Sequence, residues 1–193
     1  MPRKSVKSKK LIGLDLDGVI LDHTENRIRL AKQLGFEVLP QETPVDILVK
    51  KIGIAAYQQM KKMLYENANL ARSIPLMPGA KKGLHYLKTI GMPYVLISRR
   101  HPPDAAFVSL KVHGLWPDYF ETTNAFFVVE KKDKDIKAKA LGVTHFVDDE
   151  PSVIVELASV PVRFLFDPLG AYSEIPAGSA KVSSWAELLG KII

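Results

Sequence analysis

The chain is organised around one stretch, Leu11-Ile12-Gly13-Leu14-Asp15-Leu16-Asp17-Gly18-Val19-Ile20. Its apolar start is too short for an amphipathic helix and is typical of a buried strand. Asp15 and Asp17 come where that strand should end, and Gly18 permits a sharp turn after them. Acids at the carboxyl end of a buried parallel strand occupy the place where open α/β sheets bind ligands. If both carboxylates are buried, a cation or a proton must compensate them; the alternative is a solvated Asp-Gly turn.

The composition limits the classes of protein to consider. The chain has 193 residues, 47% of them hydrophobic, which suits one domain with a sizeable insertion or two small domains. It has no cysteine. Disulfides and thiolate metal sites are therefore excluded, whereas sites that bind a hard cation through oxygen ligands remain open.

Positive charge is concentrated at the start of the chain. The net charge is +6, and five basic residues precede the first strand: Arg3, Lys4, Lys7, Lys9 and Lys10. The rest of the chain holds 22 basic and 21 acidic residues, which argues against a protein-wide nucleic-acid surface. We interpret residues 1–10 as a basic disordered tail, with contact to RNA or anionic lipid as the alternative. No apolar run approaches membrane-spanning length, so we expect a cytoplasmic protein without a membrane partner.

The segment from residue 22 to about 75 shows helical patterns and no strand pattern. Three helices are predicted there: from 22–24 to about 34, from Thr43 as N-cap to near 53, and from about 55 to 71. Tyr57, Met60 and Leu64 recur at helical spacing, which indicates packing between helices or a face toward a substrate. The segment is too long for an ordinary loop after a strand, so we interpret it as an inserted helical subdomain.

From Pro78 onward, strand patterns alternate with helix patterns. Strands are predicted at 94–98, 125–129, 145–148 and 162–166, and helices at 79–90, 104–113, 133–141, 151–158 and 183–192. This alternation predicts an α/β fold with a doubly wound parallel sheet. We therefore divide the chain into the tail at 1–10, an α/β core at 11–21 and 76–193, and a helical cap insertion at 22–75.

Three of the predicted strands end in polar side chains: Asp15 and Asp17, Ser98, and Asp148 and Asp149. The carboxyl ends of parallel strands lie at one edge of a sheet, so these groups should meet there. Four carboxylates at one edge would repel one another unless a divalent cation joined them, and Mg²⁺ is the natural candidate. The lysine-rich run at 131–139 can add an ammonium group. Together these groups suit the binding of a phosphate.

Four motifs, in this order, resemble those of the haloacid dehalogenase (HAD) superfamily of phosphohydrolases. They are Asp15-Leu16-Asp17-Gly18-Val19, Ile97-Ser98, a lysine upstream of the fourth strand, and Val147-Asp148-Asp149. The resemblance extends over nearly the whole chain, and the helical insertion resembles a cap that closes over the active site. Two later segments are similar to the 5'(3')-deoxyribonucleotidase branch: Phe164-Leu165-Phe166-Asp167-Pro168 and Val182-Ser183-Ser184-Trp185.

The resemblance implies a Mg²⁺-dependent phosphatase that hydrolyses a small-molecule phosphomonoester, with a nucleotide among the candidates, through an aspartyl-phosphate intermediate. Asp15 would be the nucleophile, and Asp17 would protonate the leaving oxygen and then activate water. Ser98 would bind a phosphoryl oxygen. Asp15, the backbone carbonyl of Asp17, Asp148 and Asp149 would hold Mg²⁺.

The phosphate-binding lysine is predicted from its place in the sequence. Lys134 lies eight residues before Gly142, the spacing that best resembles the family pattern, and Lys131 and Lys132 are the alternatives. Of the consecutive pair Arg99 and Arg100, we expect one to lie near the substrate and the other on the surface.

Other classes of function remain as alternatives. Within enzymes, the substrate could be a sugar phosphate or another metabolite. A noncatalytic protein on the same fold is conceivable because fold does not determine function. An RNA-binding protein would use the basic tail. The sequence leaves the oligomeric state open.

Overall fold

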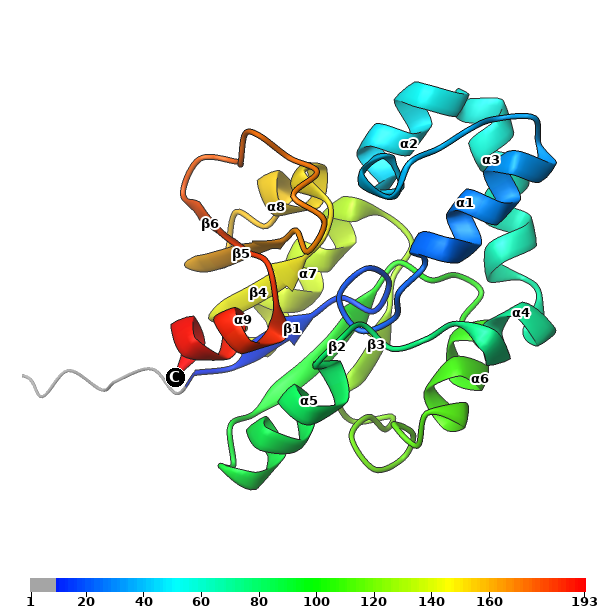
Figure 1. The fold of residues 1–193 in the computed structure, drawn as a ribbon. Coiled ribbons are helices and arrows are strands. Elements are labelled where there is room, and N and C mark those ends of the chain that lie inside the picture. Colours follow the sequence, from blue (N-terminus) through cyan, green and yellow to red (C-terminus); the bar gives the residue numbers. More distant parts are fainter. Residues whose placement is uncertain (1–9) are drawn as a thin grey trace, which may run out of the picture.

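The computed structural model describes residues 10–193 and places a six-stranded parallel sheet at the centre of the molecule (Figure 1). Its order is β3-β2-β1-β4-β5-β6, and every neighbouring pair is parallel. The strands are β1 (Ile12–Leu14), β2 (Tyr94–Ser98), β3 (Ala125–Phe127), β4 (His145–Asp148), β5 (Val162–Phe166) and β6 (Ser179–Val182). The predicted α/β fold with a doubly wound parallel sheet is confirmed. The predicted tail falls almost entirely on residues 1–9, outside the described part.

Two hydrophobic clusters cover the two faces of the sheet. Successive side chains of a strand point to opposite faces, so Leu96 joins one cluster while Val95 and Ile97 join the other. The first cluster includes side chains of α5 (Ala80–Thr89), α6 (Asp104–Val112) and α9 (Trp185–Ile192). The second includes side chains of α7 (Lys131–Leu141) and α8 (Pro151–Glu156). Parallel strands buried on both faces explain the nearly continuous apolar runs in the sequence.

A helical insert separates β1 from β2. Its elements are α1 (Thr24–Gln33), the 3₁₀ turn η1 (Pro40–Glu42), α2 (Val45–Ile52), α3 (Ile54–Tyr65) and α4 (Ala68–Ser73). The insert has a hydrophobic cluster of its own, which includes Leu30, Leu48 and Met60. It lies beyond the carboxyl ends of the central strands (Figure 1). The Ser109 hydroxyl of α6 donates a hydrogen bond of 2.7 Å to the Ala71 carbonyl and ties the insert to the core.

The insert differs from the sequence prediction in two places. The single helix predicted over 55–71 is two helices, because the Asn67 side chain accepts hydrogen bonds from the Asn69 and Leu70 amides and begins α4. Thr43 is not the N-cap of α2. That position belongs to Pro44, while the Thr43 hydroxyl donates to the Pro40 carbonyl at 2.7 Å.

The core differs from the prediction mainly at one edge of the sheet. β6 was not predicted, because Ser179-Ala180-Lys181-Val182 contains a charge and no apolar run. It gains strand structure from pairing with β5, from Arg163 opposite Ser179 to Phe166 opposite Val182. β3 ends at Phe127, two residues earlier than predicted. Within residues 10–193, no helix has the length and apolar character needed to span a membrane.

Candidate active site

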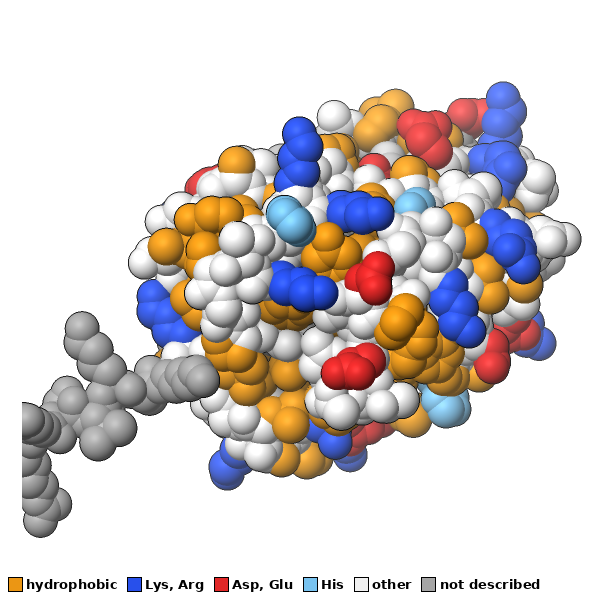
Figure 2. All heavy atoms as spheres, turned by 90° about the horizontal axis from the view of Figure 1, so that it is seen from below, with side chains coloured by type: hydrophobic (Ala, Val, Ile, Leu, Met, Phe, Trp, Pro, Cys, Tyr) orange, Lys and Arg blue, Asp and Glu red, His pale blue; other side chains and the backbone are white. Residues whose placement is uncertain are grey.

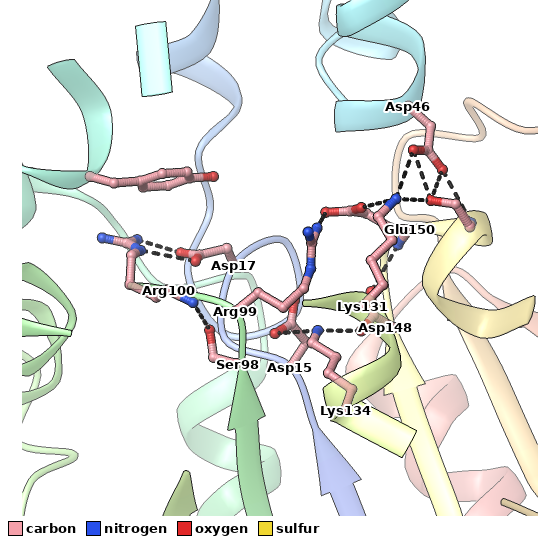
Figure 3. Close-up of polar contacts among 12 residues, drawn as sticks. Asp15, Asp17, Asp46, Ser98, Arg99, Arg100, Lys131, Lys134, Asp148 and Glu150 are labelled. Atoms are coloured by element: carbon pink, nitrogen blue, oxygen red, sulfur yellow. Dashed lines mark hydrogen bonds and ion pairs between the residues drawn. The ribbon is translucent and has the colours of Figure 1, made fainter. Parts of the chain in front are cut away.

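The carboxyl ends of β1, β2 and β4 bring the predicted site residues together. Leu14 lies between Leu96 of β2 and Val147 of β4, so the residues that follow these strands share one edge. The Asp15 amide continues the ladder with a hydrogen bond of 3.0 Å to the Val147 carbonyl. Figure 3 shows Asp15, Ser98 and Asp148 at this edge. The site therefore lies at β1, where the strand order reverses: β2 and β3 follow on one side, and β4 to β6 on the other. This is the usual ligand position in this class of fold.

A tight loop after β1 requires glycine at position 18. Gly18 has a φ of +85°, and its amide donates a hydrogen bond of 2.8 Å to the Leu21 carbonyl. A Cβ atom on this residue would lie 2.1 Å from Oδ2 of Asp149. Both the positive φ and the close approach exclude a side chain, so Gly18 allows the loop to pack directly against the second acid of Asp148-Asp149.

Asp15, Asp148 and Asp149 form an acid cluster with a lysine beside it. One oxygen from each carboxylate can be chosen so that the three lie within 4.8 Å of one another. The buried ammonium of Lys134 lies 2.8 Å from Oδ1 of Asp15 and 2.6 Å from Oδ2 of Asp148 (Figure 3). Lys132 is exposed, and Lys131 contacts a different set of side chains. The geometry thus places Lys134, and neither alternative, beside the acid cluster.

Burial dominates the protonation behaviour of the acid cluster. It raises the pKa of Asp15 to about 7, opposed by Lys134 and reinforced by Asp148 and Asp17. Burial also raises the pKa of Asp148 and, together with repulsion from Asp148 and Glu150, the pKa of Asp149. For Lys134, the two neighbouring carboxylates outweigh burial and raise the pKa above its usual value. A further positive charge beside these carboxylates would therefore stabilise their ionised forms.

The acid cluster fits a divalent cation. The cluster has three carboxylates, and the single ammonium group of Lys134 contacts two of them, so the ionised carboxylates leave an excess of two negative charges. Their donors are hard oxygen atoms, which Mg²⁺ prefers. Asp17 is predicted to bind the metal through its backbone carbonyl, and its side chain lies outside this cluster.

Asp17 is held as a carboxylate by two neighbours. Arg100 donates to it twice, from Nε to Oδ2 at 3.0 Å and from Nη2 to Oδ1 at 2.5 Å. Nε2 of the buried His23 lies 2.6 Å from Oδ1. Burial alone would raise the pKa of Asp17, but Arg100 and His23 hold it well below its usual range. Burial lowers the pKa of His23 to about 4 despite the attraction of Asp17, so His23 is neutral at pH 7.

Arg99 belongs to a second chain of charged groups that reaches the insert. Its Nη2 donates to Oε1 of Glu150 at 2.6 Å, and the Lys131 ammonium lies 3.1 Å from Oε2 of the same residue. Lys131 also lies 3.6 Å from Asp46 of α2, and Asp46 accepts a hydrogen bond of 2.7 Å from the Ser152 hydroxyl (Figure 3). Of the two arginines, Arg100 is buried and Arg99 is half-buried, and each pairs with a carboxylate at the site.

Part of this set, including Asp15, Asp17 and Arg100, lines a pocket of about 430 Å³ between the sheet edge and the insert. Asp15, Asp17 and Ser98 lie on the core side. The insert contributes Arg27 and Tyr65, among other residues. The Arg100 guanidinium stacks over the Tyr65 ring at 4.2 Å from its centroid, so it contacts both sides of the pocket. The volume is at the lower end of the range for small-molecule sites.

Several residues of the site had no signal in the sequence. His23, Arg27, Glu150, Asp46 and Tyr65 come from a loop or from helices whose approach depends on tertiary packing. The clue that the sequence offers is proximity, because His23 follows Asp17 closely and Glu150 directly follows Asp149. Tyr57 also lines the pocket, whereas Met60 is buried in the cluster of the insert.

Solved structures share this fold over most of the chain. A HAD family hydrolase from Deinococcus radiodurans, with bound phosphate and sodium, has 15% identity and a TM-score of 0.62, covering 93% of each chain. A predicted phosphoglycolate phosphatase from Haemophilus somnus has 16% identity and a TM-score of 0.62, covering 97% of this chain and 99% of that one. A dehalogenase with an intermediate complex has 13% identity and a TM-score of 0.62, with 97% and 98% covered.

The structural neighbours are thus HAD-superfamily hydrolases, and the likeness establishes the fold. No protein-family model matches the sequence, and no curated protein matches it significantly. The chemistry of this chain must therefore be argued from its own site.

Proposed function

We propose that the protein is a Mg²⁺-dependent phosphatase that hydrolyses a small-molecule phosphomonoester. The observation that carries this proposal is the position of Asp15. It lies at the carboxyl end of β1, against the Lys134 ammonium and two further carboxylates, and it lines a pocket of small-molecule size. A carboxylate can attack an anionic phosphate only where positive charge offsets the repulsion between them.

Asp15 acts as the nucleophile in this proposal. A carboxylate oxygen of Asp15 forms a bond to phosphorus, the bond from phosphorus to the leaving oxygen breaks, and an aspartyl-phosphate results. Asp17 supplies the proton for the leaving oxygen. It then takes a proton from the water that attacks the aspartyl-phosphate, which releases inorganic phosphate and restores Asp15. Ser98 binds a phosphoryl oxygen, and Lys134 offsets the negative charge at Asp15.

The contacts of Asp17 add a condition to this mechanism. In the described arrangement Asp17 is an ionised carboxylate held by Arg100 and His23, which suits the role of a base. To serve as the acid in the first step, it must first gain a proton, and contact between Arg100 and the phosphate of the substrate would loosen its hold on Asp17.

Mg²⁺ would be held by Asp15, Asp148, Asp149 and the backbone carbonyl of Asp17. When bound, it supplies positive charge beside the phosphoryl group. The acid cluster supports phosphate transfer over dehalogenation in this proposal. A divalent cation held there would offset the charge of a phosphate beside Asp15, and a carbon–halogen bond has no such charge to offset.

The helical insert is proposed to act as a cap at residues 22–75 that selects the substrate and excludes water. A nucleotide is the first substrate candidate because of the resemblance to the deoxyribonucleotidase branch. Sugar phosphates and other phosphorylated metabolites are the alternatives. The partner in either case is a small molecule.

The test is phosphate release from an aryl phosphate, nucleotides, sugar phosphates and phosphoamino acids, with halide release from haloacids as a parallel assay. We expect phosphate release that stops in EDTA and returns with Mg²⁺, and no halide release. Mg²⁺ should also raise the melting temperature, because it relieves repulsion in the acid cluster. Full activity in chelator would contradict the metal site, and halide release without phosphate release would contradict the proposed reaction.

A further inference from the structure

The two sides of the pocket differ in how their positive charges are compensated. On the core side, Arg100 pairs with Asp17, Arg99 pairs with Glu150, and Lys131 lies near Glu150 and Asp46. The insert adds three more cations to the pocket lining: Arg27 from α1, Lys50 from α2 and Lys61 from α3. None of these three forms an ion pair with any residue in the range 10–193. The insert side of the pocket therefore carries positive charge without a direct ion pair, although the more distant Asp149 carboxylate attracts Arg27.

Arg27 is the most informative of the three. Only 4% of it is exposed, and its Nη groups donate to the Thr43 carbonyl at 3.1 Å and the Tyr65 hydroxyl at 3.2 Å, both neutral acceptors. Its Nε atom is buried and has no acceptor among residues 10–193. A buried guanidinium that contacts no carboxylate directly is costly, so a binding site for an anion accounts for it better than packing does.

Two core arginines on the pocket wall also keep unused donors. Nε of Arg99 and Nη1 of Arg100 are buried without an acceptor in the described part of the chain. Guanidinium groups bind carboxylates and phosphates through two parallel N–H donors. Elsewhere, basic side chains are distributed differently. On the face shown in Figure 2 they are scattered singly among acidic, apolar and neutral groups.

We propose that the substrate is a phosphomonoester whose leaving group carries a second anionic group, a carboxylate or a phosphate, which Arg27 receives with Lys50 and Lys61 nearby. This inference rests on the proposed phosphatase function and narrows its substrate class. It favours phosphorylated acids and bisphosphates, including nucleoside bisphosphates, over phosphomonoesters with a neutral leaving group. The phosphoryl group that is transferred lies at Asp15, and the second anion lies on the insert side of the pocket.

Matched pairs of compounds test the inference. Each pair keeps one phosphomonoester and differs in the second charge: phosphoglycolate against ethyl phosphate, propanediol bisphosphate against propyl phosphate, and adenosine 3',5'-bisphosphate against adenosine 5'-monophosphate. In Mg²⁺ buffer we expect kcat/KM to be at least about tenfold higher for one or more of the doubly anionic members. The first pair reports a carboxylate as the second anion, and the other two report a phosphate.

Binding provides a readout that does not need turnover. In the full-length Asp15→Asn variant, the dissociation constants of each pair are measured by calorimetry in Mg²⁺ buffer. The doubly anionic member should bind at least about tenfold more tightly. Equal binding within all three pairs would overturn the inference whether or not the wild type turns them over. Equal turnover within all pairs would overturn it as well, yet would leave the phosphatase function standing.

Variants connect the preference to the insert. Arg27→Met should reduce the preference for the doubly anionic member by about tenfold or more, with circular dichroism to check the fold. If Arg27→Met does not fold, Lys61→Gln decides, with Lys62→Gln as its control. Both lysines are exposed on α3, but only Lys61 is among the residues that line the pocket. The preference should fall in Lys61→Gln and persist in Lys62→Gln, and an equal effect of the two changes would contradict the inference.

Discussion

The core side of the pocket and its insert side differ in how they use charge. On the core side, carboxylates at strand ends lie in contact with cations, as at Lys134 and at Arg100, so the charges hold one another in place. On the insert side, the cations Arg27, Lys50 and Lys61 form no ion pair among residues 10–193. Under the proposed function, this difference suits two separate tasks. Groups that must keep a fixed geometry are paired within the protein, and the cations without an ion pair can pair with a ligand.

The largest expected effect comes from Asp15, the proposed nucleophile on the core side. Asp15→Asn removes the attacking oxygen but keeps the size of the side chain, so kcat should fall by at least about 10³-fold. Circular dichroism should show an intact fold. Asp118→Asn, in the exposed loop after α6, is the matched control and should retain full activity. An active Asp15→Asn enzyme would refute the covalent mechanism.

The next prediction breaks the charge pairing of the core side. Asp17→Asn leaves Arg100 buried without its carboxylate, so the free energy of unfolding should fall by about 3 kcal/mol. Arg100→Met should have a similar cost because it leaves Asp17 with His23 alone. The double variant should lose less unfolding free energy than the sum of the two single losses, as measured by urea unfolding. Strict additivity would show that this ion pair does not contribute as the structure indicates.

A third prediction compares two glycines, one in the core and one in the insert. Gly18→Ala places a Cβ atom against Asp149 at a φ of +85°, whereas Gly35→Ala has a φ of +88° and no atom within 4 Å. Gly35→Ala should cost only the backbone strain, about 1 kcal/mol. Gly18→Ala should cost about 1 to 2 kcal/mol more and lower kcat/KM by about 10²-fold, because it displaces the acid cluster. Equal losses of stability and activity in the two variants would contradict the close packing of the loop.

The smallest effect is expected at the contact between the two sides. Asp46 of α2 accepts hydrogen bonds from the Ser152 hydroxyl and lies near Lys131. Asp46→Ala should therefore loosen the contact of the insert with the core without unfolding the insert. Hydrogen exchange of α2 amides should become about two- to fivefold faster, as expected for a partly exposed polar contact. Glu42→Gln is the control, because Glu42 pairs with Lys51 inside the insert. Slower exchange across residues 22–75 with Mg²⁺ and a phosphate mimic would support closure.

The sequence predicted the core side far better than the insert side. Asp15, Ser98 and Asp148 were located because parallel strands necessarily end at one edge, and a short apolar run is enough to mark such a strand. Lys134 was located from spacing and by resemblance. In these cases, the order of residues along the sequence is enough to predict which side chains lie close together in the fold.

The insert side lacks such a rule. Arg27 and Tyr65 lie 38 positions apart, and nothing in their helical patterns predicts that they share a hydrogen bond. The break between α3 and α4 depends on the side chain of Asn67, which a helical spacing of apolar residues concealed. β6 likewise depends on its neighbour β5 and not on its own composition. Such features arise from tertiary packing, which local patterns do not encode.

The central place of β1 in the sheet also has a consequence for folding. Ile12 pairs with Tyr94 on one side and with His145 on the other, so β1 precedes both of its partner strands by long stretches of chain. Loop closure of this length slows the formation of a sheet. The helical insert has a cluster of nearby contacts and can form before β2 joins β1. During synthesis, we therefore expect β1 to remain unpaired for the longest time. It is then the segment of the nascent chain most in need of protection by a chaperone.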